Sequence, residues 1–249
     1  MSAPEGKRNA MRVAICVPSA DDWKADFGFD LAGLMYCTAT YSEGLELILL
    51  NHRTSNLPNG RNQLVVDALR LGADYIFWLD ADMRFPTDTL IRLLLRKKEV
   101  VGANCVLRAY PTRATAWKDG KFLYTEAGAT GLEEVDMVGT AIMLVHTSVF
   151  QVIEPPAFFF VPRDDNPMEC LGEDQYFCKK LKAAGYQIFI DHGLSNACGH
   201  VGNHAFTMEM ARQCRDKTPV LLNDLSINKL RLETEKNGDH NLQHAANGG

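Results

Sequence analysis

The stretch Tyr75-Ile76-Phe77-Trp78-Leu79-Asp80-Ala81-Asp82 decides the fold class. Its first five residues are all apolar, which is typical of a strand that is buried on both faces of a parallel sheet. Two carboxylates follow directly, and the ends of such strands form the sheet edge at which α/β proteins bind their ligands. The stretch therefore predicts an interior strand of an α/β sheet with a polar site at its carboxyl end.

Strand and helix patterns alternate on both sides of this strand. Before it we predict, in order, a strand over 11–17 that ends at Pro18-Ser19, a helix over 30–41, a strand over 45–50, a loop over 55–60 and a helix over 61–71. After it we predict a helix that begins near Pro86 and a buried strand over 99–107. This alternation predicts a mostly parallel central sheet flanked by helices, in a single Rossmann-like domain.

The pattern is less regular after residue 107. We expect a hairpin over 117–131, a strand over 135–145 through Gly139-Thr140, an aromatic loop over 155–162, a helix over 173–184, a strand over 186–191 and a further helix over 221–235. The expected domain spans 11–205 and follows a disordered N-terminus over 1–10. A helical extension over 206–235 and a disordered tail over 236–249 come after it.

The composition excludes several classes of protein. The chain has 249 residues, of which 46% are hydrophobic and 23% charged, as in ordinary globular domains. No apolar run reaches the roughly 18 residues that a membrane span needs, and the first ten residues lack the apolar core of a signal peptide. The seven cysteines are scattered without a CxxC pair. We therefore expect reduced thiols in a cytoplasmic protein.

The formal net charge is −5, so the chain as a whole lacks the basic character of a dedicated nucleic-acid binder. The charge is uneven, however, because residues 84–121 hold nine basic and three acidic side chains, a local +6. A solvated helix face that includes Arg92, Arg96, Lys97 and Lys98 would explain this stretch. A surface that faces an anion is the alternative.

Asp80 and Asp82 have two interpretations. Two carboxylates that are two residues apart on a loop can share a hard divalent cation bound to a diphosphate. Alternatively, they form an ordinary polar strand end in which Asp82 supports a turn. Other uses of such motifs do not fit: the chain has no P-loop, no GxGxxG after the first strand and no zinc-deaminase pattern, and Arg84 stands where phosphatases of the haloacid dehalogenase type need Thr or Val.

Two later segments add candidate residues. Glu173 and Asp174 open a predicted helix, where the helix dipole alone would stabilise them, or where one of them is a general base that activates an acceptor hydroxyl. His200 lies between Gly199 and Gly202, in backbone tight enough to bring its ring to a metal, although a single histidine is usually an ordinary surface or core residue.

Together, four motifs resemble a family-2-type glycosyltransferase of the GT-A fold, in particular its compact phage and bacterial members. They are, in order, Asp80-Ala81-Asp82, Gly139-Thr140-Ala141, Glu173-Asp174 and His200-Val201-Gly202. The resemblance covers residues 11–205 and is carried by the order and spacing of the motifs, since each is weak alone. The chain departs from the family pattern at Ala141, where the family often has a second glycine.

The resemblance implies a role for each matching residue. Asp174 would be the catalytic base, with Glu173 as its neighbour or substitute. Asp82, His200 and Asp80 would hold the metal. The residues expected to contact the nucleotide-sugar donor are Pro18 and Ser19 beside the base, Arg61 at its helix start, Asp80 and Ala81, and Gly139 with Thr140. Without the resemblance, Arg61 would be a surface residue at a helix start, and Gly139-Thr140 a bulge in a strand. Arg108 is expected near the donor diphosphate because it follows the predicted strand over 99–107.

The implied function is a metal-dependent hexosyl- or pentosyltransferase that uses a nucleotide-diphosphate sugar, with a UDP-sugar favoured, and inverts the anomeric carbon. Mn²⁺ or Mg²⁺ would neutralise the leaving diphosphate. One rival is a nucleotidyltransferase of the same sheet plan. It would normally carry a Gly-rich basic loop after the first strand, where this chain has Pro18-Ser19-Ala20-Asp21-Asp22. The other rival is a non-catalytic module that binds nucleotide sugars. The oligomeric state stays open.

The acceptor is expected among carbohydrate, lipid or protein hydroxyls, with a hydroxymethylated base in phage DNA as a further candidate. Arg108 and Arg113 end the predicted strand over 99–107, at the edge that carries Asp82, and the +6 stretch around them would suit an anionic acceptor. The local explanation is that Arg108 balances the negative charge of the donor diphosphate, while Lys118 and Lys121 are solvated surface residues. An extruded base would need an aromatic pocket, for which Tyr110, Trp117 and 158–160 are candidates, and a phage enzyme would act in the host cytoplasm.

Overall fold

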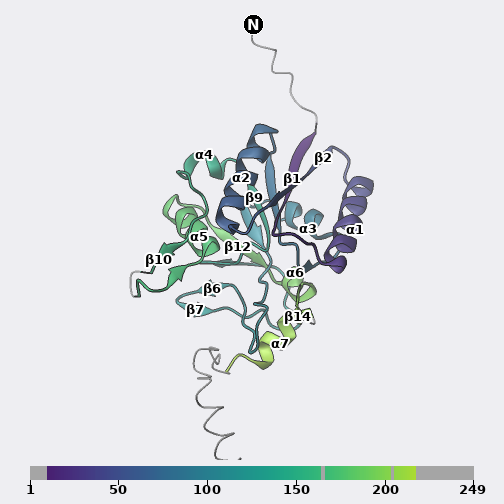
Figure 1. The fold of residues 1–249 in the computed structure, drawn as a ribbon. Coiled ribbons are helices and arrows are strands. Elements are labelled where there is room, and N and C mark those ends of the chain that lie inside the picture. The colour runs from purple at the N-terminus through teal and green to yellow at the C-terminus, as the bar shows by residue number, and fades with distance from the viewer. Residues whose placement is uncertain (1–9, 164–165, 203–204, 217–249) are drawn as a thin grey trace, which may run out of the picture. The chain divides into compact units, whose positions relative to one another are not determined.

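The computed structural model describes residues 10–163, 166–202 and 205–216, and the described residues up to Arg215 form one compact unit. A seven-stranded sheet is the centre of this unit (Figure 1). Its strands, in spatial order, are β2 (Leu45–Arg53), β1 (Met11–Ser19), β3 (Tyr75–Leu79), β9 (Ile142–His146), β5 (Val100–Gly102), β12 (Ile188–Asp191) and β8 (Leu132–Val135). The predicted helix over 221–235 and the predicted tail over 236–249 lie outside the described residues.

The prediction of a mostly parallel sheet is wrong, because the sheet is mixed. β1 runs parallel to β2 and β3, and β5 runs parallel to β12. In contrast, β9 is antiparallel to both β3 and β5, and β8 is antiparallel to β12. No helix separates β5 from β9. Because a parallel neighbour needs a crossover connection of that kind, β9 enters between β3 and β5 in the other direction, with Ile142 opposite Leu79.

Helices cover both faces of the sheet (Figure 1). One face packs against α1 (Ala25–Tyr41), α3 (Thr89–Leu95) and α6 (His192–Ala197), and the other against α2 (Leu57–Arg70), α4 (Val149–Val152) and α5 (Glu173–Ala183). Alternate residues of one strand enter opposite cores: Phe77 packs on the first face and Trp78 on the second, both fully buried. The prediction of a doubly buried strand over 75–79 is therefore confirmed.

Small β elements surround the carboxyl edge of the sheet. They are a three-stranded sheet of β4 (Met83–Arg84), β13 (Gly199–Val201) and β14 (Ala205–Thr207), a hairpin of β6 (Trp117–Lys118) and β7 (Lys121–Phe122), and a pair of β10 (Val161–Pro162) and β11 (Cys170–Leu171). The pairing of β13 with β4 is important for the site, because it places His200 opposite Met83, the residue after Asp82. The Val201 N–H also donates to the Asp82 carbonyl, at 2.7 Å.

Three predicted boundaries need correction. The loop over 55–60 is already helical from Leu57, because the Asn56 side chain accepts from the Asn59 N–H and Pro58 is tolerated in the first turn. The strand over 99–107 stops at Gly102. The strand over 135–145 is two strands, β8 and β9, and Gly139-Thr140 lies in the connection between them.

β14 and the last described helix, α7 (Met208–Gln213), lie within the compact unit. The predicted domain boundaries stay predictions. Five of the seven cysteines are buried, Cys37 is half-buried and Cys170 is exposed, and all seven are free thiols. Among the described helices, none is long and apolar enough to cross a membrane.

Candidate functional site

A cavity of about 680 Å³ opens at the carboxyl edge of the sheet, where β1, β2 and β3 end. We call it the edge cavity. It is lined by Pro18, Ser19, Ala20, Asp21, Asp22, Lys24, Thr54, Ser55, Leu57, Asp80, Ala81, Asp82, Arg108 and His200. Seven of the predicted site residues are in this set, and the first and last of them, Pro18 and His200, are 182 residues apart in the sequence.

Asp82, His200 and Arg108 form a close cluster in the edge cavity. The Asp82 carboxylate receives the Arg108 guanidinium at 2.7 Å, and the same oxygen, Oδ2, lies 3.1 Å from His200 Nε2. On the other side of the imidazole, His200 Nδ1 lies 2.9 Å from the Val106 carbonyl oxygen. Because a carbonyl only accepts, Nδ1 carries the hydrogen, and Nε2 is the nitrogen that can present a lone pair when the ring is neutral.

Two side chains of this cluster, Asp82 and His200, have the chemistry and spacing of ligands for a divalent cation. Metal-bound histidines usually donate their second N–H to a carbonyl or carboxylate, as His200 does to Val106. Two adjacent ligands of an octahedral ion with bonds of about 2.1 Å lie about 3 Å apart, close to the separation of Asp82 Oδ2 and His200 Nε2. Asp80 is turned to another partner, however, and the described residues hold no group of three His, Cys, Asp or Glu side chains arranged around one metal position.

Asp82 and His200 stabilise each other's charged forms. Burial alone would raise the pKa of Asp82, but its hydrogen bond to His200 and the charges of His200 and Arg108 outweigh burial and lower that pKa. Burial alone would lower the pKa of His200, but the hydrogen bond and charge of Asp82, with the Val106 carbonyl, raise it. Protonation of His200 and ionisation of Asp82 therefore favour each other.

A second cluster lies behind the cavity wall, around Arg61. Its Nη2 donates to Asp80 Oδ1 at 2.8 Å, and its Nε lies 3.5 Å from Glu173 Oε1. The guanidinium carbon lies 5.4 Å from the centre of the Trp78 ring and 5.8 Å from that of Phe158. Arg61 thus connects the end of β3 to the start of α5 from within the core.

The predicted role of Arg61 in contacting the donor does not agree with this position. The residue is only 1% exposed and does not line the edge cavity. A helix start at residue 61 would have placed the side chain at the surface. Since α2 begins at Leu57, position 61 lies one turn inside the helix, on the face that packs against the sheet. Arg61 therefore fixes Asp80 and Glu173 in place.

Glu173 and Asp174 open α5, as predicted, but their side chains have different surroundings. Glu173 is buried against Arg61, whereas Asp174 is half-buried and its Oδ1 accepts the Gln175 N–H at 2.7 Å. Burial raises the pKa of both carboxyls and outweighs the opposing charge of Arg61. Gly172 leaves the space that Asp174 needs, because a Cβ there would lie 2.8 Å from Asp174 Oδ1.

Gly139 and Thr140, predicted to contact the donor, are buried and do not line the edge cavity. A Cβ on Gly139 would press on the Thr115 side chain at 3.3 Å. The next residue, Ala141, accepts the Asp80 N–H through its carbonyl at 3.0 Å. The segment that holds Gly139 and Thr140 connects β8 to β9 and is not the continuous strand that we predicted. Its contact with the site is the hydrogen bond from Asp80 to Ala141.

Several residues that line the edge cavity are not among the predicted site residues. Asp21 and Lys24 belong to the loop after β1, and Thr54 and Ser55 belong to the loop after β2. The order of the predicted strands held a signal for these residues. β1 and β2 are parallel neighbours, so the loops after them must meet at the same edge of the sheet. The Thr54 N–H donates to the Ser19 carbonyl at 2.9 Å, so the two loops are joined.

The charge of the +6 stretch is largely compensated in the fold. Five of its nine basic residues pair with carboxylates: Arg84 with Asp30, Arg92 with Asp88, Arg96 with Asp191, Arg108 with Asp82 and Lys118 with Glu133. Lys97 and Lys98 line a hollow with Met11 and Tyr75, the first residues of their strands, at the sheet edge opposite Asp82. The stretch does not form one basic surface beside the edge cavity.

The aromatic residues that were candidates for a base pocket lie in different parts of the structure. Phe158 is a core residue that packs on Trp78 and Phe177, so it cannot receive an extruded base. Phe159 and Tyr110 are exposed, whereas Trp117 is half-buried in the β6–β7 hairpin. These side chains do not line one common pocket among the described residues.

Comparisons with known proteins show a fold and no family. No protein-family model matches the chain, and no curated protein matches its sequence. Among solved structures, A197 from STIV has a TM-score of 0.55 at 15% identity, over 80% of this chain and 92% of A197. A Drosophila β-1,4-galactosyltransferase 7 mutant in complex with manganese, UDP-Gal and xylobiose has a TM-score of 0.46 at 14% identity, over 89% of this chain and 79% of that one. The likeness to A197 shows a shared fold alone, and the second is too low to carry an argument.

Proposed function

We propose that this chain is a metal-dependent glycosyltransferase of GT-A-like fold, which moves a sugar from a nucleotide-diphosphate donor to an acceptor hydroxyl. The observation that carries the proposal is the edge cavity itself. It gathers the end of β1, both carboxylates of the Asp80-Ala81-Asp82 motif and His200 at the ligand-binding edge of the sheet. These residues belong to the motifs that resemble the glycosyltransferase family.

The charges of the edge cavity support the use of a metal. Four carboxylates line it, together with Lys24, Arg108 and His200, and two of the carboxylates, Asp80 and Asp21, also pair with arginines outside the lining, Arg61 and Arg53. A divalent cation at Asp82 would reduce the repulsion between these carboxylates and a diphosphate. Asp82 and His200 are the side chains that would hold Mn²⁺ or Mg²⁺, which would stabilise negative charge on the leaving diphosphate.

Arg108 would take part in donor binding by changing partners. Its side chain is exposed and pairs with Asp82 in the lining of the edge cavity. With Asp82 engaged as a metal ligand, the Arg108 guanidinium would turn toward the diphosphate, to which it offers a planar set of donors. Pro18 and Ser19 would border the nucleotide, for which we favour a uridine.

Asp174 is our candidate for the catalytic base. Its pKa is raised by burial, which makes its ionised form a better proton acceptor. The acceptor hydroxyl would give its proton to Asp174 while its oxygen bonds to the anomeric carbon, and the bond from that carbon to the diphosphate oxygen would break. Attack from the side opposite the leaving group inverts the anomeric carbon. Glu173 holds Arg61 and is the weaker candidate.

Two measurements test this function. A thermal-shift panel of UDP- and GDP-sugars, with and without Mn²⁺, should show one donor that raises the melting temperature in a metal-dependent, saturable way. The same donor should then release nucleoside diphosphate on incubation. Release of pyrophosphate from a nucleoside triphosphate and a sugar phosphate would instead establish the nucleotidyltransferase. Binding of a donor without any turnover would establish the non-catalytic module.

A further inference from the structure

Helix α1 is apolar on two opposite sides. The side that packs on the core holds the buried residues Phe27, Leu31, Leu34 and Thr38. The opposite side carries a second row, whose positions are alternately four and three residues apart and therefore share one face of the helix. We call this row the outer stripe, and it consists of Ala25, Phe29, Ala32, Tyr36 and Ala39.

The outer stripe is exposed to solvent. Phe29 is 81% exposed and Tyr36 is 73% exposed, and the three alanines are exposed as well. The two charged residues of α1, Asp26 and Asp30, both pair with Arg84, so no charge of the helix lies on the stripe. A surface helix normally has polar residues on its outer side, and a helix that is apolar all round is normally buried. In Figure 1, α1 lies at the right-hand margin of the unit, where the described residues leave this face uncovered.

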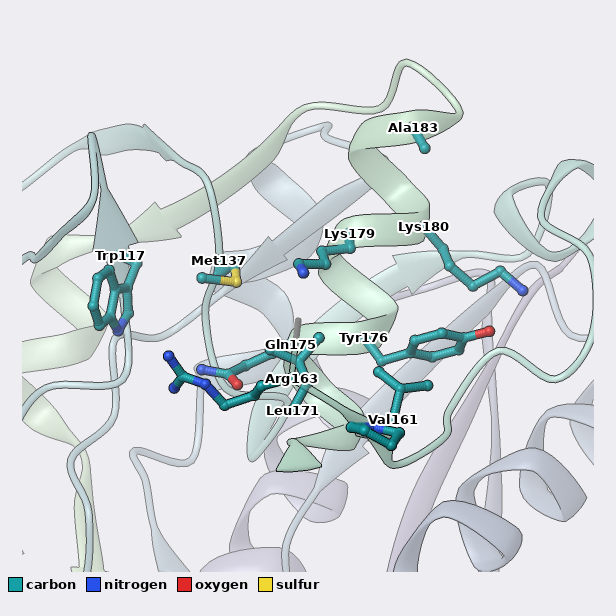
Figure 2. A pocket seen from close by; sticks show the side chains of 11 residues that line it. Trp117, Met137, Val161, Arg163, Leu171, Gln175, Tyr176, Lys179, Lys180 and Ala183 are labelled. Carbon is teal, nitrogen blue, oxygen red and sulfur yellow. The ribbon is translucent and has the colours of Figure 1, made fainter. Parts of the chain in front are cut away.

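Other partly exposed aromatic side chains are contacted by a neighbour in the same chain. A hollow of about 620 Å³ along α5 contains two examples (Figure 2). The Lys180 amine lies 5.4 Å from the centre of the Tyr176 ring, and Trp117 packs on Phe122 with 4.5 Å between ring centres. In the described part of the chain, no ring or cation lies against the two aromatic side chains of the outer stripe. Their partner must therefore come from another molecule.

The outer stripe is complementary to a second copy of itself. In an antiparallel pair of α1 helices with a two-fold axis at the level of Leu34, residues equally far from position 34 meet. Phe29 then lies opposite Ala39 of the second copy, and Ala32 lies opposite its Tyr36. Each layer combines one ring with one methyl group, which fills the space between the helices evenly. A parallel pair would place ring against ring and methyl against methyl.

The charges at the ends of α1 favour the same arrangement. Lys24 precedes the helix and Glu43 follows it, and both are exposed. They are 19 residues apart, which is roughly 28 Å along a helix, so they cannot pair within one chain. Antiparallel helices bring Lys24 of each copy beside Glu43 of the other. They also place the positive end of each helix dipole beside the negative end of its partner.

We propose that the chain forms a two-fold symmetric dimer through the outer stripe, with the two α1 helices antiparallel. An isologous contact of this kind needs only one surface, present on both copies. A membrane fits the stripe less well, because helices that lie on membranes are rich in Lys and Arg beside their apolar face, whereas Asp26 and Glu43 adjoin this one. The stripe does not line the edge cavity, so the dimer does not depend on the proposed transferase function.

The size of the stripe sets the expected affinity. Two aromatic side chains bury roughly 400 Å² per copy, about half of the ~800 Å² that a standard interface buries on each partner. The dimer should therefore dissociate in the micromolar range. Sedimentation velocity on the full chain, from about 1 µM to about 300 µM, covers this range.

The first variant removes the anchors of the interface. Phe29→Gln/Tyr36→Gln changes two exposed positions to a residue that favours helices at least as well, so folding should be unaffected. Tyr41→Gln is the matched control, because Tyr41 is 77% exposed at the end of the same helix but lies outside the stripe. We expect the double variant to weaken dimerisation at least tenfold and the control to leave it unchanged.

A charge exchange tests the antiparallel direction. Lys24→Glu and Glu43→Lys should each weaken the dimer about fivefold at low salt, and the variant that carries both should recover the original affinity. Such recovery can arise only between copies, because the two residues are too far apart within one. Losses that add up in the combined variant would overturn the antiparallel arrangement.

A chain that stays monomeric at about 300 µM, or a dimer that keeps its affinity in Phe29→Gln/Tyr36→Gln, would overturn the proposal as a whole. Binding to phosphatidylcholine and phosphatidylserine vesicles through the stripe, without self-association, would overturn it in favour of a membrane surface.

Discussion

Two arginine–aspartate pairs flank Ala81, and they differ in their surroundings. Arg61 meets Asp80 at 2.8 Å and Arg108 meets Asp82 at 2.7 Å, so the ion pairs are equally close. The Arg61 side chain, however, is 2% exposed and that of Arg108 is 47% exposed. The buried pair is held by rings and by Glu173, whereas the open pair shares its carboxylate with His200.

The difference in exposure indicates that the two aspartates of this short motif have different roles, one structural and one in ligand binding. Removing one partner of a buried ion pair leaves an uncompensated charge in the core, which is strongly destabilising. An exposed pair contributes little to stability, so it can be exchanged for contacts with a ligand. We therefore assign Asp80 and Arg61 to the framework of the site, and Asp82 and Arg108 to ligand binding. Four experiments can break or sharpen this assignment.

The largest effect is expected for Asp82→Asn. An amide binds a divalent cation far less well than a carboxylate, so sugar transfer in saturating Mn²⁺ should fall about a thousandfold, or about 4 kcal/mol of transition-state stabilisation. Its melting temperature without ligands should stay close to that of the unmodified chain. Asp21→Asn is the matched control in the same cavity and should keep activity within a few-fold. An active Asp82→Asn enzyme would remove the metal proposal.

The next effect is expected for Arg61→Met, measured by urea denaturation. The substitution keeps an apolar stem between Trp78 and Phe158 but leaves Asp80 and Glu173 without their cation. We expect the free energy of unfolding to fall by roughly 3 kcal/mol. Arg70→Met is the control, since it lies on the same helix with an exposed side chain and should change stability by less than about 0.5 kcal/mol. Equal stabilities of the two variants would contradict the framework role of Arg61.

A smaller effect is expected for Arg108→Gln. Its exposed pair with Asp82 should contribute less than about 1 kcal/mol to stability. Loss of a guanidinium contact to the diphosphate should weaken donor binding about tenfold, as measured by titration calorimetry with the donor in Mn²⁺. The difference should shrink as salt is raised, because exposed charges are screened. A marked loss of stability with unchanged donor affinity would reverse the roles that we assign to the two arginines.

The smallest effect is a difference in pH dependence between the unmodified chain and Glu173→Gln. Burial raises the pKa of Glu173 in the folded chain above its usual value of 4.5, so the folded chain keeps a proton that the unfolded chain has lost. The associated stability is fully present below the unfolded pKa and is lost as pH rises through the folded pKa. Urea denaturation from pH 4 upward should therefore show a downward slope that is weaker in Glu173→Gln. Identical slopes would mean that the pKa of Glu173 does not change on folding.

Much of the fold followed from local patterns. The apolar run before Asp80 predicted β3, and the apolar spacing around residues 64–69 predicted most of α2. The prediction that failed, a mostly parallel sheet, depended on pairing between strands that are far apart in the sequence. The direction of β9 is set by its neighbours β3 and β5, which are far away in the sequence. Hydrophobic periodicity is the same for a strand that runs either way, so it could not show this direction.

For the candidate site, too, local features could be predicted from the sequence and contacts between distant segments could not. The sequence by itself determined which chemical groups are present and that Asp80 and Asp82 follow a buried strand, since both facts are local. Only the tertiary structure decided that Arg61 is in the core and that Asp82 Oδ2 lies 3.1 Å from His200 Nε2. The physical reason is that burial and charge pairing depend on which segments pack together, and packing joins residues that the order of the chain keeps far apart.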